Sequence, residues 1–220
     1  MHEKENSISD SSYTIYVRTY IDGKKASQNE YDIMYKEPNK KKTIEKAAGK
    51  ESLIIYDGNI EWHYDIETNS VQKIIIPEEY QNLDAEYSQF FKEISKEFNI
   101  SVIGTEIIDE RNAYRLEAKP KAAADENESY PIDRIEIWVD AEKWIPLKYE
   151  VYGSTQKIEI EIKNLKINTG IPDSKFKFKI PEGANITTMN FEDPFKENIP
   201  HERTNIPSEG EKETSIIVAI

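Results

Sequence analysis

The sequence predicts a mainly β protein, in which antiparallel strands form one large sheet and a single long amphipathic helix lies over its concave face. Three observations favour this class. Apolar and polar side chains alternate with a period of two in many segments, Asp-Gly pairs mark hairpin turns, and only one segment repeats its apolar residues every three or four positions. The chain has 220 residues, enough for one β domain with a substantial core.

Composition excludes several classes of function. The formal net charge of −13 argues against a nucleic-acid partner, because phosphate binding needs clustered cations. No cysteine is present, which excludes disulfides and thiol chemistry. No stretch reaches the roughly 18 apolar residues of a membrane helix, and residues 1–12 lack the apolar core of a signal peptide.

The first half of the chain predicts a series of strands. Residues 1–12 are polar and are expected to be disordered. A strand then alternates from Tyr13 to Ile21, and Asp22-Gly23 predicts a tight turn that needs positive φ. Further strands are expected at 31–35, 53–56, 60–65 and 71–76, the last one stopped by Pro77, and a second Asp-Gly turn follows Tyr56.

The period then changes to that of a helix. Apolar residues recur at Leu83, Tyr87, Phe90, Phe91, Ile94 and Phe98. The spacing predicts an amphipathic helix over about 84–99, with its charged side in water.

Two hairpins and a long terminal stretch follow. Residues 101–108 and 112–119 are expected to pair, as are 135–139 and 144–152, with a polar loop at 120–131 between the hairpins. In the next strand Ile158, Ile160 and Ile162 alternate with charged residues, but Leu165 breaks the phase, which predicts a bulge or bend near Asn164.

The end of the sheet is predicted at Gly183. A tight turn or short helical turn is expected at 172–174, followed by alternation at Phe176, Phe178 and Ile180, and Pro181 cannot donate to a ladder. Residues 187–220 are expected to form an extended tail. Its apolar end, 215–220, could add an edge strand, occupy a groove or begin a further element.

No catalytic signature is present. The sequence has no nucleophile elbow, phosphate loop or zinc-binding helix motif, and its three histidines are scattered. Glu61, His63 and Asp65 share one face of one strand, but such a row spans about 13 Å, too far for one ion. The prediction is therefore a protein that is not an enzyme and that holds no metal or cofactor.

Three sets of residues resemble the lipoprotein-carrier family (LolA/LolB-like, including homologues of outer-membrane lipoprotein-sorting proteins). They are Tyr56-Asp-Gly-Asn with Trp62, Tyr64-Asp, Thr68-Asn and Val71; the hairpin Ile137-Trp-Val-Asp-Ala-Glu-Lys-Trp-Ile-Pro-Leu-Lys-Tyr-Glu-Val151; and Asn168 with Gly170-Ile-Pro-Asp, Phe176, Phe178 and the closing Pro181 and Gly183. The resemblance implies a curved, incompletely closed antiparallel β-barrel of about a dozen strands, with helices over a groove that holds acyl chains. Residues 1–12 are too short and polar to supply the helix with which family members begin, so part of that lid is expected to be missing.

The resulting hypothesis is a β domain over residues 13–186 that binds lipid or lipoprotein acyl chains outside the cytoplasm, as a carrier, sorting factor or envelope-lipid sensor, with a membrane-associated protein as a further partner. The alternative is a cell-surface protein-interaction module with a filled core. The residues expected to line the groove between sheet and helix are Trp62, Tyr64, Phe90, Phe91, Ile94, Phe98, Ile135, Ile137, Trp138, Trp144, Tyr149, Ile158 and Ile160.

Overall fold

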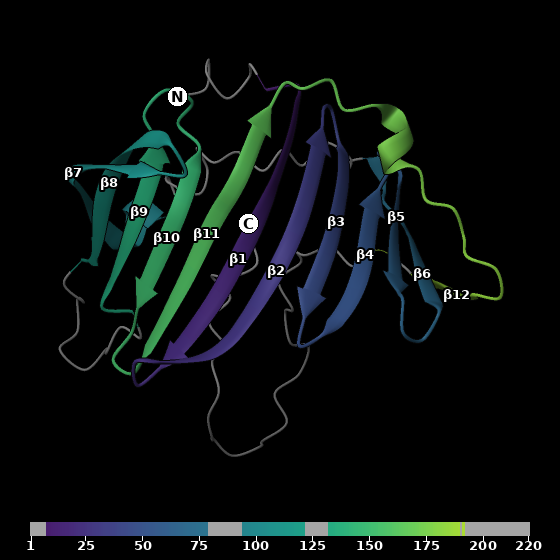
Figure 1. The fold of residues 1–220 in the computed structure, drawn as a ribbon, viewed down its shortest axis with the longest axis horizontal. Coiled ribbons are helices and arrows are strands. Elements are labelled where there is room, and N and C mark those ends of the chain that lie inside the picture. Colours follow the sequence, from purple (N-terminus) through teal and green to yellow (C-terminus); the bar gives the residue numbers. More distant parts are fainter. Residues whose placement is uncertain (1–7, 79–93, 122–131, 190, 192–220) are drawn as a thin grey trace, which may run out of the picture.

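A computed structural model describes residues 8–78, 94–121, 132–189 and 191. Within these residues the fold is one open sheet of 12 strands, which twists from one edge to the other (Figure 1). The strand order is β12-β6-β5-β4-β3-β2-β1-β11-β10-β9-β8-β7, so the described strands run from a β12 edge to a β7 edge without closing. The expected incompletely closed sheet of about a dozen strands is confirmed.

Most strands pair with the next strand along the chain, and two pairings join strands far apart in the sequence, β1 with β11 and β12 with β6. Their bounds are β1 (Asp10–Ile21), β2 (Lys24–Lys36), β3 (Lys40–Ala47), β4 (Lys50–Tyr56), β5 (Ile60–Asp65), β6 (Ser70–Ile75), β7 (Phe98–Ile108), β8 (Arg111–Pro120), β9 (Arg134–Asp140), β10 (Pro146–Tyr152), β11 (Gln156–Ile167) and β12 (Asn185–Met189).

Two of the predicted turns have the geometry their residues indicate. Asp22 and Gly23 both have positive φ, 49° and 73°, and they join β1 to β2 as a two-residue turn. The turn expected at Asp109-Glu110-Arg111 is one residue shorter than predicted: Asp109 and Glu110 have positive φ, 48° and 65°, and Arg111 opens β8. Local chemistry at these positions therefore sets the register of the two longest hairpins.

The N-terminal boundary needs a correction. Residues 10–12 were expected in a disordered segment, yet they form the start of β1. Asp10 is buried, and its carboxylate accepts hydrogen bonds from the backbone N–H groups of Thr169 and Gly170 at 2.8 and 3.0 Å. Burial acts to raise the pKa of Asp10, but these donors outweigh it and hold the pKa below its ordinary value.

The predicted end of the sheet is also wrong. Residues 168–184, here called the crossover segment, run past the ends of β1 to β5 and carry the chain to the far edge, where β12 pairs with β6 in parallel (Figure 1). Its contacts mark the path: Lys36 Nζ donates to the Ile171 carbonyl at 2.8 Å, Lys40 Nζ lies 2.7 Å from Asp173 Oδ2, and Asn69 Nδ2 donates to the Glu182 carbonyl. The sheet is thus not wholly antiparallel, and it extends beyond residue 186.

The helical turn expected in this segment is confirmed. The strand expected from the alternation of Phe176, Phe178 and Ile180 is not formed. Residues Asp173–Phe176 form a 3-10 helix, and no strand is assigned between that helix and β12. Phe178 stacks on Trp62 with ring centroids 5.2 Å apart, and Phe176 is buried. The apolar side chains of the crossover segment therefore cover the sheet instead of extending it.

The long amphipathic helix predicted over 84–99 lies largely outside the described residues. Residues 94–97 are helical, whereas Phe98 and Asn99 open β7. Ile94 and Phe98 are both buried in the main apolar cluster. The helix therefore ends two residues earlier than predicted.

Candidate functional site

One face of the sheet carries an apolar surface that continues across seven adjacent strands, from β2 through β1, β11, β10, β9 and β8 to β7. We call it the inner face. Register explains the continuity, because directly paired residues share a face: Ile15 stands opposite Ile162, and Ile160 opposite Tyr149. Its buried members are Ile15, Ile33, Ile94, Phe98, Ala118, Ile132, Ile135, Ile137, Val139, Tyr149, Ile160 and Ile162.

The predicted irregularity in β11 keeps this face continuous. Thr14 pairs with Lys163 and Ser12 with Lys166, so one extra residue is accommodated between them. Asn164 takes it up with a φ of 57°, a left-handed conformation that asparagine tolerates. The N–H of Asn164 donates to Asp109 Oδ2 at 2.8 Å. The bulge predicted from the spacing of Ile162 and Leu165 is confirmed.

Toward β7 the inner face becomes exposed while staying apolar. The side chains of Val102 and Ile107 are 66% and 69% exposed, and that of Tyr114 on β8 is 36% exposed. Tyr114 stacks on Trp144, with ring centroids 5.8 Å apart, and Trp144 packs against the buried cluster. An apolar surface open to a ligand therefore adjoins the dry core at this end of the sheet.

Beyond β2 the same face changes to polar residues. On this face Ile33 of β2 stands opposite Thr43 of β3, and Tyr31 stands opposite Glu45. Across the next two strands, Thr43 stands opposite Ile54 of β4, and Ile54 stands opposite His63 of β5. Lys41 also lies on this side. The side chain of Lys41 is exposed in part, but the protein around its ammonium group removes water and so lowers the pKa of Lys41. The negative charge of Glu61 acts to raise this pKa and is the smaller effect. The inner face is thus divided into an apolar part and a polar part.

Glu61, His63 and Asp65 do share the inner face, as the alternation predicted. His63 Nε2 lies 2.5 Å from Glu61 Oε1, while Asp65 Oδ1 accepts the backbone N–H of Thr68. In the parts of the chain that the structure describes, no group of three or more such side chains is placed to hold a metal ion.

The opposite, outer face carries ion pairs over β1 and β8 to β11. Arg18 bridges Glu159 and Glu161 at 2.7 and 2.9 Å. Glu150 is buried beside Lys148 and Lys157, at 2.8 and 3.3 Å. Burial acts to raise the pKa of Glu150, but the hydrogen bonds from Lys148 and Tyr152 outweigh it and lower the pKa to about 2.

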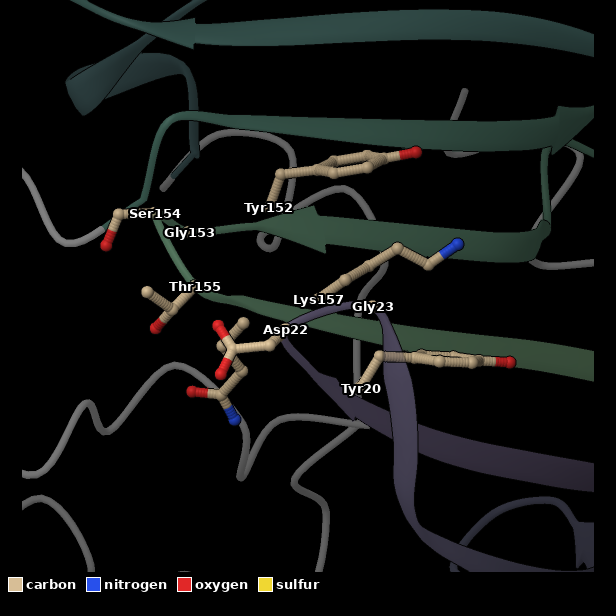
Figure 2. Close-up of a pocket in the computed structure, with 9 residues that line it drawn as sticks. Tyr20, Asp22, Gly23, Tyr152, Gly153, Ser154, Thr155 and Lys157 are labelled. Atoms are coloured by element: carbon tan, nitrogen blue, oxygen red, sulfur yellow. The ribbon is translucent and has the colours of Figure 1, made fainter.

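The outer face also has a hollow of about 530 Å³ between the β1–β2 and β10–β11 turns. Figure 2 shows Lys157 lying between the rings of Tyr20 and Tyr152, with Ser154, Thr155 and Asp22 at the turns. Lys157 Nζ lies 5.3 and 5.7 Å from the two ring centroids. The lysine therefore already occupies the space between the aromatic side chains.

The structure separates the 13 residues expected to line a groove. Ile94, Phe98, Ile135, Ile137, Tyr149, Ile158, Ile160 and Trp144 meet on or against the inner face. Trp62 and Tyr64 lie on the outer face beneath Phe178. Trp138 is also on the outer face, where its Nε1–H donates to Glu106 at 2.8 Å. Phe90 and Phe91 lie outside the described residues.

Sequence reasoning missed the contribution of the first two strands and of β8 to this face. The missed members on these three strands are Tyr13, Ile15, Val17, Tyr31, Ile33, Leu116 and Ala118, and Val139 on β9 and Ile162 on β11 were missed as well. The period-2 alternation of these strands could have identified them, because it places their apolar side chains on one face of the strand and the charged side chains on the other. The residues predicted to line the groove included all three tryptophans. Trp138 follows Ile137 directly in β9, so its side chain points to the outer face when that of Ile137 points to the inner face.

Comparisons with known proteins give a family and a fold. A family model described as "-like: Uncharacterized protein" matches residues 41–159, more than half of the 220 residues. Uncharacterized protein MJ0687 of Methanocaldococcus jannaschii is 33% identical over 187 residues, which cover 84% of this chain and 51% of the relative. The chain therefore spans about half the length of this curated relative.

Solved structures share the architecture at low identity. An uncharacterized conserved protein from Thermus thermophilus matches with a TM-score of 0.54 and 11% identity, covering 86% of this chain and 96% of that one. Lipoprotein LppX of Mycobacterium tuberculosis matches at 0.48 and 11%, covering 78% and 92%. LolA superfamily protein NE2245 from Nitrosomonas europaea matches at 0.37 and 14%, covering 80% and 95%.

None of the helices in the described ranges combines the length and apolar character needed to cross a membrane.

Proposed function

The chain belongs to the family whose model matches residues 41–159, and from its fold and its divided inner face we propose that it binds lipid or lipoprotein acyl chains without catalysis. The proposed setting is outside the cytoplasm, where the protein would act as a carrier, a sorting factor or an envelope-lipid sensor. A membrane-associated protein is the proposed further partner. Three sets of sequence motifs that resemble lipoprotein carriers support the same reading.

The continuous apolar inner face is the observation that carries this proposal. It extends over seven strands and ends in side chains that remain exposed, including Val102 and Ile107. An acyl chain laid against it would gain about 0.8 kcal/mol for each buried methylene. No catalytic or strongly polar group is needed for such binding, which fits the absence of a catalytic motif from the sequence.

The polar part of the inner face suits the other end of an amphiphile. Lys41, Glu45, Glu61 and His63 lie on β3 and β5, on the same side of the sheet as the apolar part. A polar head group placed there would keep its hydrogen bonds while its chains extend toward β7. The proposed ligand is therefore a molecule with both a polar head and acyl chains.

The three tryptophans allow a direct test, because they lie on different faces. Trp144 adjoins the inner face, whereas Trp62 and Trp138 lie on the outer face. A brominated fatty acid quenches only nearby indole rings. We expect it to quench the fluorescence of the wild type and of the Trp62→Phe and Trp138→Phe variants, and to lose this component in Trp144→Phe.

Two results would count against the proposal. If the brominated chain leaves the wild-type fluorescence unchanged, no acyl chain reaches the inner face, and the protein-interaction module with a filled core becomes the better account. If quenching persists in Trp144→Phe but disappears in Trp138→Phe, the chain binds on the outer face. Circular dichroism of each variant controls for folding.

A further inference from the structure

The two edge strands of the sheet share a sequence feature. Asn99-Ile-Ser101 lies at the start of β7, and Asn185-Ile-Thr187 lies at the start of β12. These strands form the two edges of the sheet, far apart in Figure 1. Both triplets have the form Asn-X-Ser/Thr, in which asparagine accepts N-linked glycans, and we call them the edge triplets. A third such triplet, at Asn127, lies outside the described residues.

Within the described residues, asparagines away from the two edge strands do not belong to such triplets. Two positions after each of them stands a residue other than serine or threonine. These asparagines are Asn29, Asn39, Asn59, Asn69, Asn112, Asn164 and Asn168. In this part of the chain the acceptor form therefore occurs where the sheet has no further strand.

The side chains of both edge triplets are accessible. Asn99 and Ser101 are exposed on β7, and Asn185 and Thr187 are exposed on β12. Within the described residues, neither asparagine amide has a hydrogen-bond partner in its side chain. Because side chains two positions apart in a strand share a face, the amide and the hydroxyl of each triplet lie on the same side of their strand.

The backbone of the β12 triplet is fixed without use of its side chains. The N–H of Asn185 donates to the Asn69 carbonyl at 3.0 Å. In the parallel register with β6, Asn185 stands beside Ser70 and Thr187 stands beside Gln72, so these two side chains have no charged partner in register. The Asn185 amide is therefore held at the surface by its strand and remains unengaged.

The two edges carry few charges to discourage pairing with another strand. β12 has no charged residue and no proline, and its Ile186 and Met189 are 46% and 45% exposed. β7 has a single charged residue, Glu106, and relies on the bulge between Val102 and Gly104. A bulky, hydrophilic glycan near the start of each strand would hinder pairing there.

We propose that Asn99 and Asn185 carry N-linked glycans, which cap the two edges of the sheet. This inference rests on the extracytoplasmic setting of the proposed function, because such glycans belong to secreted and surface proteins.

The modification is a group transfer from an oligosaccharide joined to a polyprenyl phosphate, catalysed by an oligosaccharyltransferase of the cell. A bond forms between the asparagine amide nitrogen and the anomeric carbon of the sugar, while the bond from that carbon to the phosphate oxygen breaks. The amide nitrogen loses one proton, and the lipid phosphate leaves with the bonding electrons. The reaction involves no oxidation or reduction.

Peptide mass spectrometry of the protein purified from the envelope fraction of its own cells tests the proposal. We expect glycopeptides at Asn99 and Asn185, and an unmodified peptide at Asn112, an exposed asparagine of β8 that is outside any such triplet. Ser101→Ala and Thr187→Ala should each abolish the glycan of their own triplet. Thr187→Ser, which keeps the hydroxyl, should restore it.

The capping role has a separate readout. The Asn99→Gln/Asn185→Gln double variant keeps polar side chains but has no acceptor asparagine at either edge. We expect it to self-associate at a concentration at least about tenfold lower than the glycosylated wild type, because its edges are open to pairing. Light scattering measures this, and Asn112→Gln is the matched control that should behave as the wild type.

The outcomes separate this proposal from the proposed function. Unmodified Asn99 and Asn185 in protein recovered from the envelope would overturn the glycans and leave acyl-chain binding untouched, and a glycan on one of them alone would overturn the assignment at the other. Protein confined to the cytoplasm would overturn both the setting and the glycans. A double variant that self-associates no more than the glycosylated wild type would overturn the capping role.

Discussion

Asp140 shows how a single buried carboxylate organises a turn. It ends β9, it is 2% exposed, and its Oδ1 accepts the backbone N–H groups of Glu142 and Lys143 at 2.8 and 2.6 Å. Its Oδ2 lies 2.6 Å from Arg111 Nη1 on β8. One side chain thus fixes the β9–β10 turn, which contains Trp144, and ties it to the neighbouring hairpin.

Replacing Asp140 by alanine should destabilise the protein. The change leaves two N–H groups and one guanidinium without their acceptor, and we expect a loss of about 2 to 3 kcal/mol in the free energy of unfolding. Urea denaturation measures it. Asp133→Ala, at an exposed carboxylate in the same part of the chain, is the control, and equal effects from both variants would contradict the role given to Asp140.

Glu150 predicts a dependence of stability on pH. Its pKa is about 2 in the folded protein, against an ordinary value of 4.5, so the unfolded chain binds the proton more readily. The stabilisation is fully present above pH 4.5 and is lost as pH falls through about 2. The full shift corresponds to at most about 3 kcal/mol.

The Glu150→Gln variant isolates this contribution. The free energy of unfolding of the wild type should fall more steeply than that of the variant between pH 4.5 and pH 2.5, as followed by urea denaturation at several pH values. Parallel curves for the two proteins would show that Glu150 is not the group responsible.

Among the elements, the crossover segment determines how far the sheet extends. Asp10, Lys36 and Lys40 hold it at successive strands, Phe178 stacks on Trp62 on the outer face, and Phe176 is buried. Ile55 and Val71 on that face are buried. The segment therefore covers Trp62 and Tyr64 of β5 and delivers β12 to the edge beside β6.

Removal of the Phe176 ring should be costly. Phe176 is buried, and Phe176→Ala should lower the free energy of unfolding by about 3 to 5 kcal/mol through lost burial and an unfilled cavity. Ile180→Ala, an exposed apolar position of the same segment, should change it by less than about 0.5 kcal/mol. Thermal and urea unfolding compare the two, and a small effect at Phe176 would mean that the segment is only loosely attached.

How well elements could be predicted depended on whether their signals were local. The bulge at Asn164 and the turns at Asp22-Gly23 and Asp109-Glu110 were predicted, because phase and φ requirements lie within a few residues. The parallel pairing of β12 with β6 joins residues more than 100 positions apart, and no local pattern encodes it. The alternation at Phe176 and Phe178 suggested a strand. In the structure Phe176 ends a 3-10 helix and is buried, and Phe178 stacks on Trp62.

At the scale of the molecule, the covered surfaces lie on different sides of the sheet in its two parts. From β2 to β7 the inner face is apolar, whereas over β4 to β6 the outer face holds the buried Ile55 and Val71. Alternation alone gives two faces for each strand but does not say which face of one strand matches which face of the next. That is why Trp62 and Tyr64 were grouped with residues from which the structure separates them.

The resemblance to lipoprotein carriers is drawn from motifs in three parts of the chain, and the likeness of fold is carried by the uncharacterized protein from Thermus thermophilus. Acyl-chain binding, the extracytoplasmic setting and the membrane-associated partner stay proposals. They rest on the apolar inner face and its exposed end near Val102 and Ile107.

Native mass spectrometry of the purified protein, followed by organic extraction and lipid analysis, shows whether the protein binds acyl chains. We expect a stoichiometric adduct that solvent releases and that lipid analysis identifies as a molecule with acyl chains. A clean mass of the unliganded chain, together with no quenching of Trp144 by a brominated fatty acid, would contradict it.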